Sequence, residues 1–231
     1  IDTRESGPAI ARRLAGGLAA SGVRTRFAGV ITTPGVAYLT RTDDFVAGVI
    51  VSASHNPFQD NGIKIFGHSG YKLPDGQEHE LEAGIFELLR RGVEAGPVEL
   101  TEDSGLDRRY LEFLASTFPH RLDRLRIVID CANGAAGKLG PELLERLGAH
   151  TLAIHCSPDG RNINLNSGAL HVEPLRQAVL DAGADLGVAL DGDADRAIFV
   201  SKRGAVVDGD AVLLMTARHL LQRGELSGPG G

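Results

Sequence analysis

The segment Asp185–Arg196, DLGVALDGDADR, decides the fold class of this chain. Its first half, Asp185–Leu190, is an almost continuous apolar run, which is typical of a strand buried on both faces of a sheet. Directly after it come three carboxylates, Asp191, Asp193 and Asp195. Open α/β sheets bind their ligands beyond the carboxyl ends of such strands. The segment therefore predicts an α/β fold with a ligand site at this turn.

Strands and helices alternate on both sides of this segment. We expect strands at Phe27–Ile31, Ala47–Ser52, Gly62–Phe66, Arg126–Asp130, His150–Ile154, Asp185–Leu190, Ala197–Ser201 and Ala205–Val207. We expect helices at 7–21, from Thr33, and at Gln77–Arg91, Arg108–Thr117, Pro141–Leu147, Pro174–Ala182 and Ala211–Gln222. The helix at Gln77–Arg91 is expected to be amphipathic, with one apolar face. This pattern indicates two consecutive three-layer α/β units. A polar, glycine-containing stretch at 92–107 separates them, so we expect domains at 1–107 and 108–231.

Composition excludes several classes of protein. The 231 residues include 24 Lys and Arg against 30 Asp and Glu, a net charge of −6, which argues against a general nucleic-acid binder. No apolar run approaches the roughly 20 residues of a membrane span. Two cysteines cannot build a disulfide framework, so a reducing cytoplasm is expected. The chain starts at Ile1 rather than Met, and we expect it to be a fragment, with an upstream targeting signal left open.

The turn DGDADR favours a divalent cation. Carboxylates at alternate positions of a tight turn converge and repel one another, and a cation relieves that repulsion. Carboxylate oxygens suit Mg²⁺ or Ca²⁺ better than zinc. An EF-hand is excluded because its sixth position would be Arg196 and its twelfth Lys202. Three ligands leave coordination open for phosphate or water, which suits Mg²⁺; the alternative is a solvated acidic turn.

A second candidate site is SASHNP, which begins at Ser52, at the end of the continuous apolar run AGVIVS. Such a run is typical of a strand covered on both faces. The hydroxyl of Ser54 could act as a nucleophile or carry a phosphoryl group. A hydrolase triad is unsupported, since the stretch is not G-x-S-x-G and His55 directly follows Ser54. The alternative is an Asx-type turn at Asn56.

Two basic residues could serve the same cleft. Lys64 alternates with two isoleucines in GIKIF, so it points to the opposite face and is either a surface lysine or an acid–base group. Arg4, in the N-terminal stretch DTRESG, could bind phosphate through its guanidinium fork, although most loop arginines are only solvated.

Two further loops carry weaker signals. The loop CANGAAG, Cys131–Gly137, lacks the order of a P-loop or of G-x-G-x-x-G, so we expect it to allow tight packing of a strand against a helix. The loop Pro158–His171 is long and rich in Asn and Gly, which is typical either of a functional loop or of an irregular connection.

Taken together, SASHNPFQDNGIKIF and DGDADR resemble the α-D-phosphohexomutase superfamily. Within it, TPGVAYLTRT, DCANGAAG, PDGRNIN and VDGDAVL are similar to the bacterial phosphoglucosamine mutases. The resemblance implies two consecutive three-layer α/β/α phosphohexomutase-type domains with mixed sheets. It also implies a four-domain protein, of which this chain lacks the opening strand and the C-terminal domains. The chain departs from that pattern at Ala194, where the family often has Gly, and at SGALH, Ser167–His171, where it usually has CGSTH.

The resemblance also implies a role for each candidate residue. Ser54 matches the serine that is phosphorylated, and Asp191, Asp193 and Asp195 match the Mg²⁺ ligands, with a phosphoserine oxygen completing the shell. Arg196 matches the arginine beside that phosphate. Lys64 and His55 match residues thought to support proton transfer, and Arg4 matches a cleft arginine.

The implied reaction interconverts glucosamine 6-phosphate and glucosamine 1-phosphate through the phosphoserine and a sugar bisphosphate. The implied partners are a phosphorylated hexosamine and the missing C-terminal domains, with a homodimer left open. The fragment alone is expected to turn over little substrate. Three alternatives stay open: a phosphomannomutase or phosphoglucomutase of the same mechanism, a metal-dependent phosphatase with Asp191 as nucleophile, and a non-catalytic phosphosugar-binding module.

Overall fold

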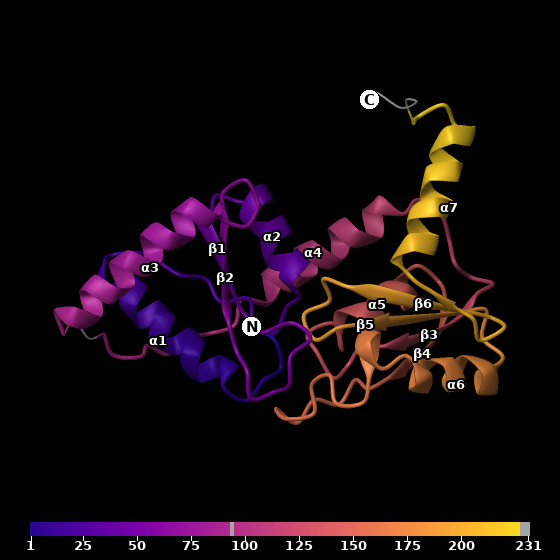
Figure 1. Cartoon of the computed structure of the whole chain (residues 1–231), viewed down its shortest axis with the longest axis horizontal. Helices are drawn as coiled ribbons and strands as arrows, with labels where there is room; N and C mark the ends of the chain where they lie inside the picture. The colour runs from indigo at the N-terminus through magenta and orange to yellow at the C-terminus, as the bar shows by residue number, and fades with distance from the viewer. Residues whose placement is uncertain (93–94, 227–231) are drawn as a thin grey trace.

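The computed structural model describes residues 1–92 and 95–226, which form two α/β units (Figure 1). In the second unit, β3 is parallel to both β4 and β5, whereas β6 is antiparallel to β5 and to β7. The sheet order is β4-β3-β5-β6-β7. The strands span Arg126–Asp130 (β3), His150–Ile154 (β4), Leu186–Leu190 (β5), Ala197–Ser201 (β6) and Val206–Val207 (β7).

Helices cover both faces of this mixed sheet. Val128 packs in one cluster with Leu175 and Val179 of α6 (Glu173–Ala182). The next residue, Ile129, points to the other face and lies against Gly140 of α5 (Leu139–Arg146). Each fully buried aliphatic side chain stabilises the fold by roughly 1.5–3 kcal/mol. The alternation of side chains along β3 therefore creates the three layers.

The first unit is built around a smaller sheet. Strands β1 (Ala47–Val51) and β2 (Ile63–Gly67) pair antiparallel, and the N–H of Asp2 donates to the carbonyl of Val51 (3.2 Å). Helix α2 packs against both strands. The helices of this half span Gly7–Ala20 (α1), Thr33–Thr42 (α2), Asp75–Arg90 (α3) and Ser104–Thr117 (α4).

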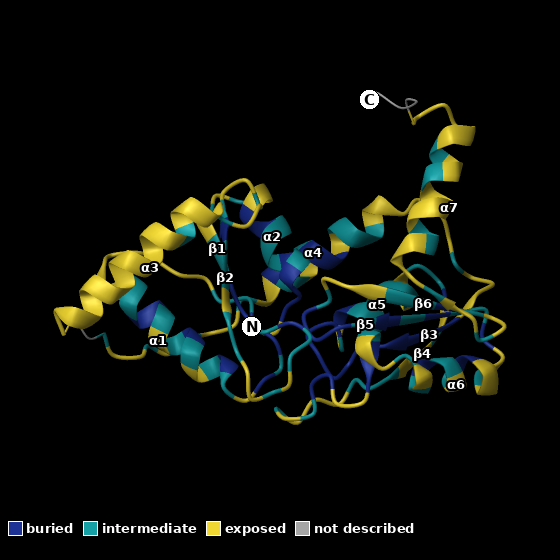
Figure 2. Ribbon diagram, viewed as in Figure 1, coloured by how far each residue is buried: buried dark blue, intermediate teal, exposed yellow. Residues whose placement is uncertain are grey.

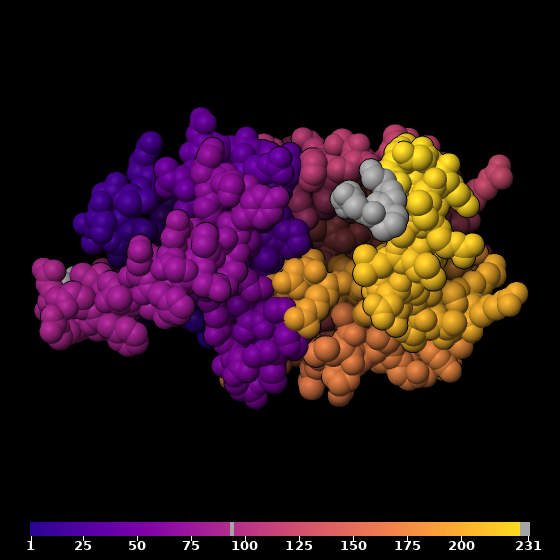
Figure 3. All heavy atoms as spheres, turned by 45° about the horizontal axis from the view of Figure 1, so that its top comes forward, coloured from indigo at the N-terminus to yellow at the C-terminus, as the bar shows by residue number. Residues whose placement is uncertain are grey.

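Helix α4 joins the two units. Its Leu106, Tyr110 and Leu111 lie in the core of the first unit, in a cluster that also includes Ile50 and extends to Leu139 of α5. The boundary expected between residues 107 and 108 falls inside this helix. The space-filling view shows the violet surface of the first unit meeting the orange surface of the second (Figure 3).

Three sequence expectations need correction. The strand expected at Phe27–Ile31 does not form: Gly29 has a positive φ of 68°, and Phe27 makes only an isolated bridge. Strand β1 is covered on both faces only at its carboxyl end, where adjacent Ile50 and Val51 are buried. Helix α3 forms, but none of its residues is buried (Figure 2).

The last helix, α7 (Gly209–Gln222), likewise has no buried residue. Among the described helices, none is both long and apolar enough to cross a bilayer.

Candidate active site

The two loops singled out in the sequence meet between the units. The hydroxyl of Ser54, which follows β1, donates a hydrogen bond of 2.7 Å to Oδ2 of Asp191, which follows β5. These residues are 137 positions apart, and both side chains are buried. Ser54 has a φ of 53°, a left-handed conformation that costs an L-residue roughly 1–2 kcal/mol. Such strain at a nucleophile candidate is typical of functional sites.

The three aspartates of DGDADR converge as the spacing predicts. Asp191, Asp193 and Asp195 each offer a carboxylate oxygen, and these oxygens all lie within 4.8 Å of one another. Ala194 turns the chain between them with a φ of 57°. The turn rests on the CANGAAG loop, whose Ala135 N–H donates to the carbonyl of Gly192 (2.8 Å). The CANGAAG loop thus supports the acidic turn, a contact that its sequence did not predict.

Basic and hydroxyl groups of the first unit face this acidic cluster. The ammonium of Lys64 on β2 lies 2.7 Å from Asp193 and 3.3 Å from Asp195. Partial burial is the largest single influence on Lys64 and lowers its pKa, but the hydrogen bonds and charges of Asp193 and Asp195 together outweigh it and raise the pKa of Lys64. Thr33, at the start of α2, donates its hydroxyl to Asp193 and its N–H to the Asp193 carbonyl (2.9 Å). Lys64 therefore points into the site.

The carboxylates do not share one ionisation behaviour. Burial raises the pKa of Asp191, and the charges of Asp193 and Asp195 add to the rise, although the Ser54 hydroxyl opposes it. Burial also opposes the charge of Asp193, but hydrogen bonds from Lys64 and Thr33 lower its pKa overall. The cluster thus holds negative charge that a cation would stabilise.

The residues present fit Mg²⁺. The donor set is three carboxylates with the Ser54 hydroxyl beside them, all hard oxygen atoms. In addition, Oδ1 of Asp193 is buried and has no hydrogen-bond partner among the described residues. A buried acceptor without a partner is costly, and a metal ion would satisfy it.

Two further residues adjoin the site: His55, which follows Ser54, and Arg196, which follows Asp195. The Nδ1 atom of His55 is buried and has no hydrogen-bond partner within the described structure. The main-chain N–H of Arg196 donates to Oδ1 of Asp191 (3.2 Å), and its guanidinium is about half exposed, 3.9 Å from Asp195. Arg196 is therefore open to an anion at the rim.

Arg4 is buried. It is 1% exposed, and the partners of its guanidinium in this structure are protein oxygens. It pairs with Asp2 (2.8 Å) and donates to the carbonyl of Ser54 (2.7 Å). The phosphate-binding role expected of Arg4 stays a prediction.

The sequence did not identify four residues of the site: Asp2, Thr33, Ser52 and Asn164. The amide of Asn164 donates to the carbonyls of Ser54 (2.9 Å) and Asn56 (3.2 Å) from the second unit. The signal for Asn164 was its place in the long Asn-rich loop Pro158–His171. The other three residues open stretches that the sequence analysis quoted, DTRESG, TPGVAYLTRT and SASHNP, but nothing in those stretches gave Asp2, Thr33 or Ser52 a role.

Comparison with known proteins places this site in a family. The family models for the phosphoglucomutase/phosphomannomutase alpha/beta/alpha domain I and domain II match residues 1–91 and 108–204. The chain belongs to the phosphoglucomutase/phosphomannomutase family. The expected pair of α/β/α domains with a mixed sheet is thereby confirmed.

Individual members of the phosphoglucomutase/phosphomannomutase family cover nearly all of the chain. It is 59% identical over 227 residues to a phosphoglucosamine mutase of Solibacter usitatus and 49% identical to that of Koribacter versatilis. A family protein of Burkholderia thailandensis matches with a TM-score of 0.79 at 25% identity, over 96% of this chain and 50% of that one. The alignments cover 98% and 97% of this chain but 51% and 50% of the two relatives, so it spans about half their length.

Proposed function

We propose that this chain is the first half of a phosphoglucosamine mutase. The whole protein would interconvert glucosamine 6-phosphate and glucosamine 1-phosphate. The observation that carries the proposal is the 2.7 Å hydrogen bond between Ser54 and Asp191, which joins a strained, buried serine to the acidic cluster. The relatives named phosphoglucosamine mutase support the same choice.

In this proposal, Ser54 carries the phosphoryl group. Phosphoserine 54 gives its phosphoryl group to the sugar phosphate, and Ser54 takes the other phosphoryl group back from the resulting bisphosphate. Phosphoryl transfer depends mainly on positioning and on stabilising charge. The fixed backbone at Ser54 supplies the positioning, and Arg196 stands at the rim to contact phosphate oxygens.

Asp191, Asp193 and Asp195 would hold Mg²⁺. When bound, the ion withdraws charge from the oxygen that links Ser54 to its phosphate, which makes the serine a better leaving group. Lys64 and His55 would hold and move the proton of the sugar hydroxyl. Lys64 is held in its charged form by Asp193, and His55 has a ring nitrogen without a partner in the described structure.

The decisive experiment uses the full-length protein. Glucosamine, glucose and mannose 6-phosphates are offered in turn, and we expect the highest kcat/KM for the aminosugar. The Ser54→Ala variant should lose turnover, and mass spectrometry should find phosphate on Ser54. Phosphate on Asp191 would instead support the phosphatase. A wild-type protein that binds these sugar phosphates but turns none of them over would support the non-catalytic binding module.

A second candidate within the same mechanism is phosphomannomutase or phosphoglucomutase. The description of the matched family and the Burkholderia thailandensis structure favour it. A higher kcat/KM for mannose or glucose 6-phosphate in the same assay would select it.

The remaining proposals concern partners and organisation. The further half of the relatives' length would supply the C-terminal domains that complete the substrate site, so we expect little turnover from the 231-residue chain alone. We also propose that the domains span residues 1–107 and 108–231. The whole protein is proposed to form a homodimer and to be located in the cytoplasm. Light scattering of the full-length protein tests the dimer.

A further inference from the structure

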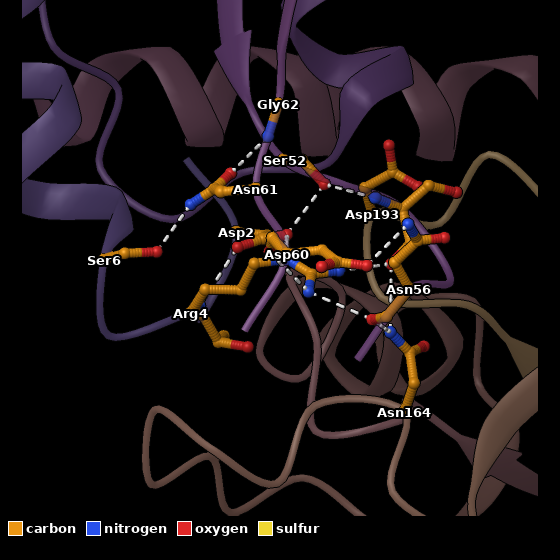
Figure 4. Close-up of polar contacts among 12 residues, drawn as sticks. Asp2, Arg4, Ser6, Ser52, Asn56, Asp60, Asn61, Gly62, Asn164 and Asp193 are labelled. Atoms are coloured by element: carbon orange, nitrogen blue, oxygen red, sulfur yellow. Dashed lines mark hydrogen bonds and ion pairs between the residues drawn. The ribbon is translucent and has the colours of Figure 1, made fainter. Parts of the chain in front are cut away.

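One buried guanidinium organises the loop that carries Ser54 (Figure 4). Arg4 donates through Nη2 to the carbonyl of Ser54 (2.7 Å). Through Nη1 it donates to the carbonyls of Asn56 (3.0 Å), Pro57 and Asp60 (3.1 Å). Four carbonyls of a single loop thus converge on one side chain. Only the planar fork of arginine presents donors in so many directions.

A second set of contacts holds the other side of Ser54. Oδ2 of Asp2 accepts both the Nε–H of Arg4 (2.8 Å) and the hydroxyl of Ser52 (2.7 Å). The Ser52 oxygen in turn accepts the main-chain N–H of Ser54 (2.9 Å). The carbonyl of Ser54 is therefore held by Arg4 directly, and its N–H is held by Asp2 through the Ser52 hydroxyl.

The Asp2–Arg4 ion pair is buried and has no net charge. Asp2 and Arg4 are both essentially inaccessible to solvent, and the charge of each neutralises the other. The pair therefore adds little field at the acidic cluster, and its effect on Ser54 is geometric. That effect has a specific target, because Ser54 adopts a left-handed φ of 53° that a serine leaves when it is not held.

From these contacts we infer that Asp2, Arg4 and Ser52 are positioning residues for Ser54. They fix its peptide groups in the left-handed conformation that aims Oγ at Asp191. The inference rests on the proposed function for its kinetic consequence, but its structural consequence can be measured without any turnover.

Ser52→Ala is the sharpest test, because it removes the acceptor of the Ser54 N–H and leaves the Asp2–Arg4 pair intact. Arg4→Lys is the second variant: it keeps the charge and loses the fork. Thr40→Val is the matched control. Thr40 is another buried hydroxyl of the first unit, but it donates to the carbonyl of Val36, and within the described residues it makes no hydrogen bond to the Ser54 loop.

In the full-length protein we expect kcat to fall about tenfold or more in Ser52→Ala and Arg4→Lys, with KM changed less than about twofold, because misplacing a reacting atom acts on the reaction step. Hydrogen exchange of a peptide spanning 52–62 should speed up in both variants. Thr40→Val should change neither kcat nor this exchange.

Two results would overturn the inference: wild-type kcat in Ser52→Ala and Arg4→Lys, or unchanged exchange of the 52–62 peptide. Failure of the proposed function is separate, because it shows as an active Ser54→Ala variant or as a wild-type protein without mutase turnover. In those cases the exchange measurement alone still decides whether the network holds Ser54.

Discussion

Gly134 and Gly192 pack so closely that a Cβ on Gly134 would lie 2.4 Å from the carbonyl oxygen of Gly192. The neighbouring atoms are all main chain and cannot rotate away. Gly134→Ala must therefore push the acidic turn aside. We expect it to lower the free energy of unfolding by about 1–3 kcal/mol, as measured by urea denaturation.

The control for this substitution is Gly84→Ala in α3. A Cβ there meets no atom within 4 Å, so alanine should stabilise the helix by roughly 0.5–1 kcal/mol. If the two substitutions changed the free energy of unfolding equally, the contact between Gly134 and Gly192 would not limit the side chain at position 134.

Ala194 offers the opposite change. Its φ of 57° is unfavourable for alanine and free of that penalty for glycine, although glycine also loses more chain entropy on folding. We expect Ala194→Gly to raise the free energy of unfolding by up to about 1 kcal/mol. Ala178→Gly in α6 should instead destabilise by about 1 kcal/mol. A destabilised Ala194→Gly protein would contradict the left-handed assignment.

Asp193 should be required for metal affinity but not for folding. Asp193→Asn keeps the size of the side chain and removes its charge. We expect the Kd for Mg²⁺, measured by calorimetry, to rise at least about tenfold with a Tm close to that of the parent. Asp181→Asn, at an exposed position of α6, should leave the Kd unchanged. Unaltered affinity in the Asp193 variant would remove it from the ligand set.

Lys64 should weaken cation binding, because its ammonium lies against two of the three carboxylates. Lys64→Met removes that like charge. A charge about 4 Å away is worth about 1 kcal/mol even in water, so Mg²⁺ should bind roughly fivefold tighter or more. Lys72→Met, which removes an exposed lysine paired with Glu78, is the control. Weaker binding in Lys64→Met would mean that Lys64 supports the ion instead.

Tyr110 should make the fold sensitive to alkali. Burial raises the pKa of its hydroxyl in the folded state, whereas the unfolded chain has the ordinary value near 10. The contribution of protonated Tyr110 to the free energy of unfolding is therefore complete below about pH 10. It is lost as the pH rises through the pKa that Tyr110 has in the folded state. We expect the urea midpoint to fall above pH 10, and to fall less in Tyr110→Phe. Parallel pH profiles for the two proteins would contradict this.

The sequence was sufficient to predict the second unit and the main site. Strand β3 at Arg126–Asp130 and strand β6 at Ala197–Ser201 have the predicted bounds, because apolar runs between turn residues are local signals. The convergence of Asp191, Asp193 and Asp195 followed from their spacing within one turn. The family resemblance, rather than any local pattern, linked Ser54 to them.

The sequence could not predict the environment of residues whose neighbours come from distant parts of the chain. An arginine near a strand end looks the same in sequence whether it faces a cleft or, like Arg4, a ring of carbonyls. The apolar residues of α3 predicted a buried face, but burial needs a neighbouring surface, and none of the described residues covers that helix. The strand expected at Phe27–Ile31 failed through one positive φ at Gly29.

The inward carbonyls around Arg4 have a consequence for the opposite side of that loop. None of the described peptide bonds is cis, so a unit that turns its oxygen toward the guanidinium turns its N–H outward; the Asn56–Pro57 unit is the exception, because proline carries no N–H. The amides of His55 and Asn61, which share peptide units with the carbonyls of Ser54 and Asp60, therefore face away from Arg4. The Ser54 loop thus presents carbonyl oxygens to the buried arginine and these two N–H groups to the opposite side.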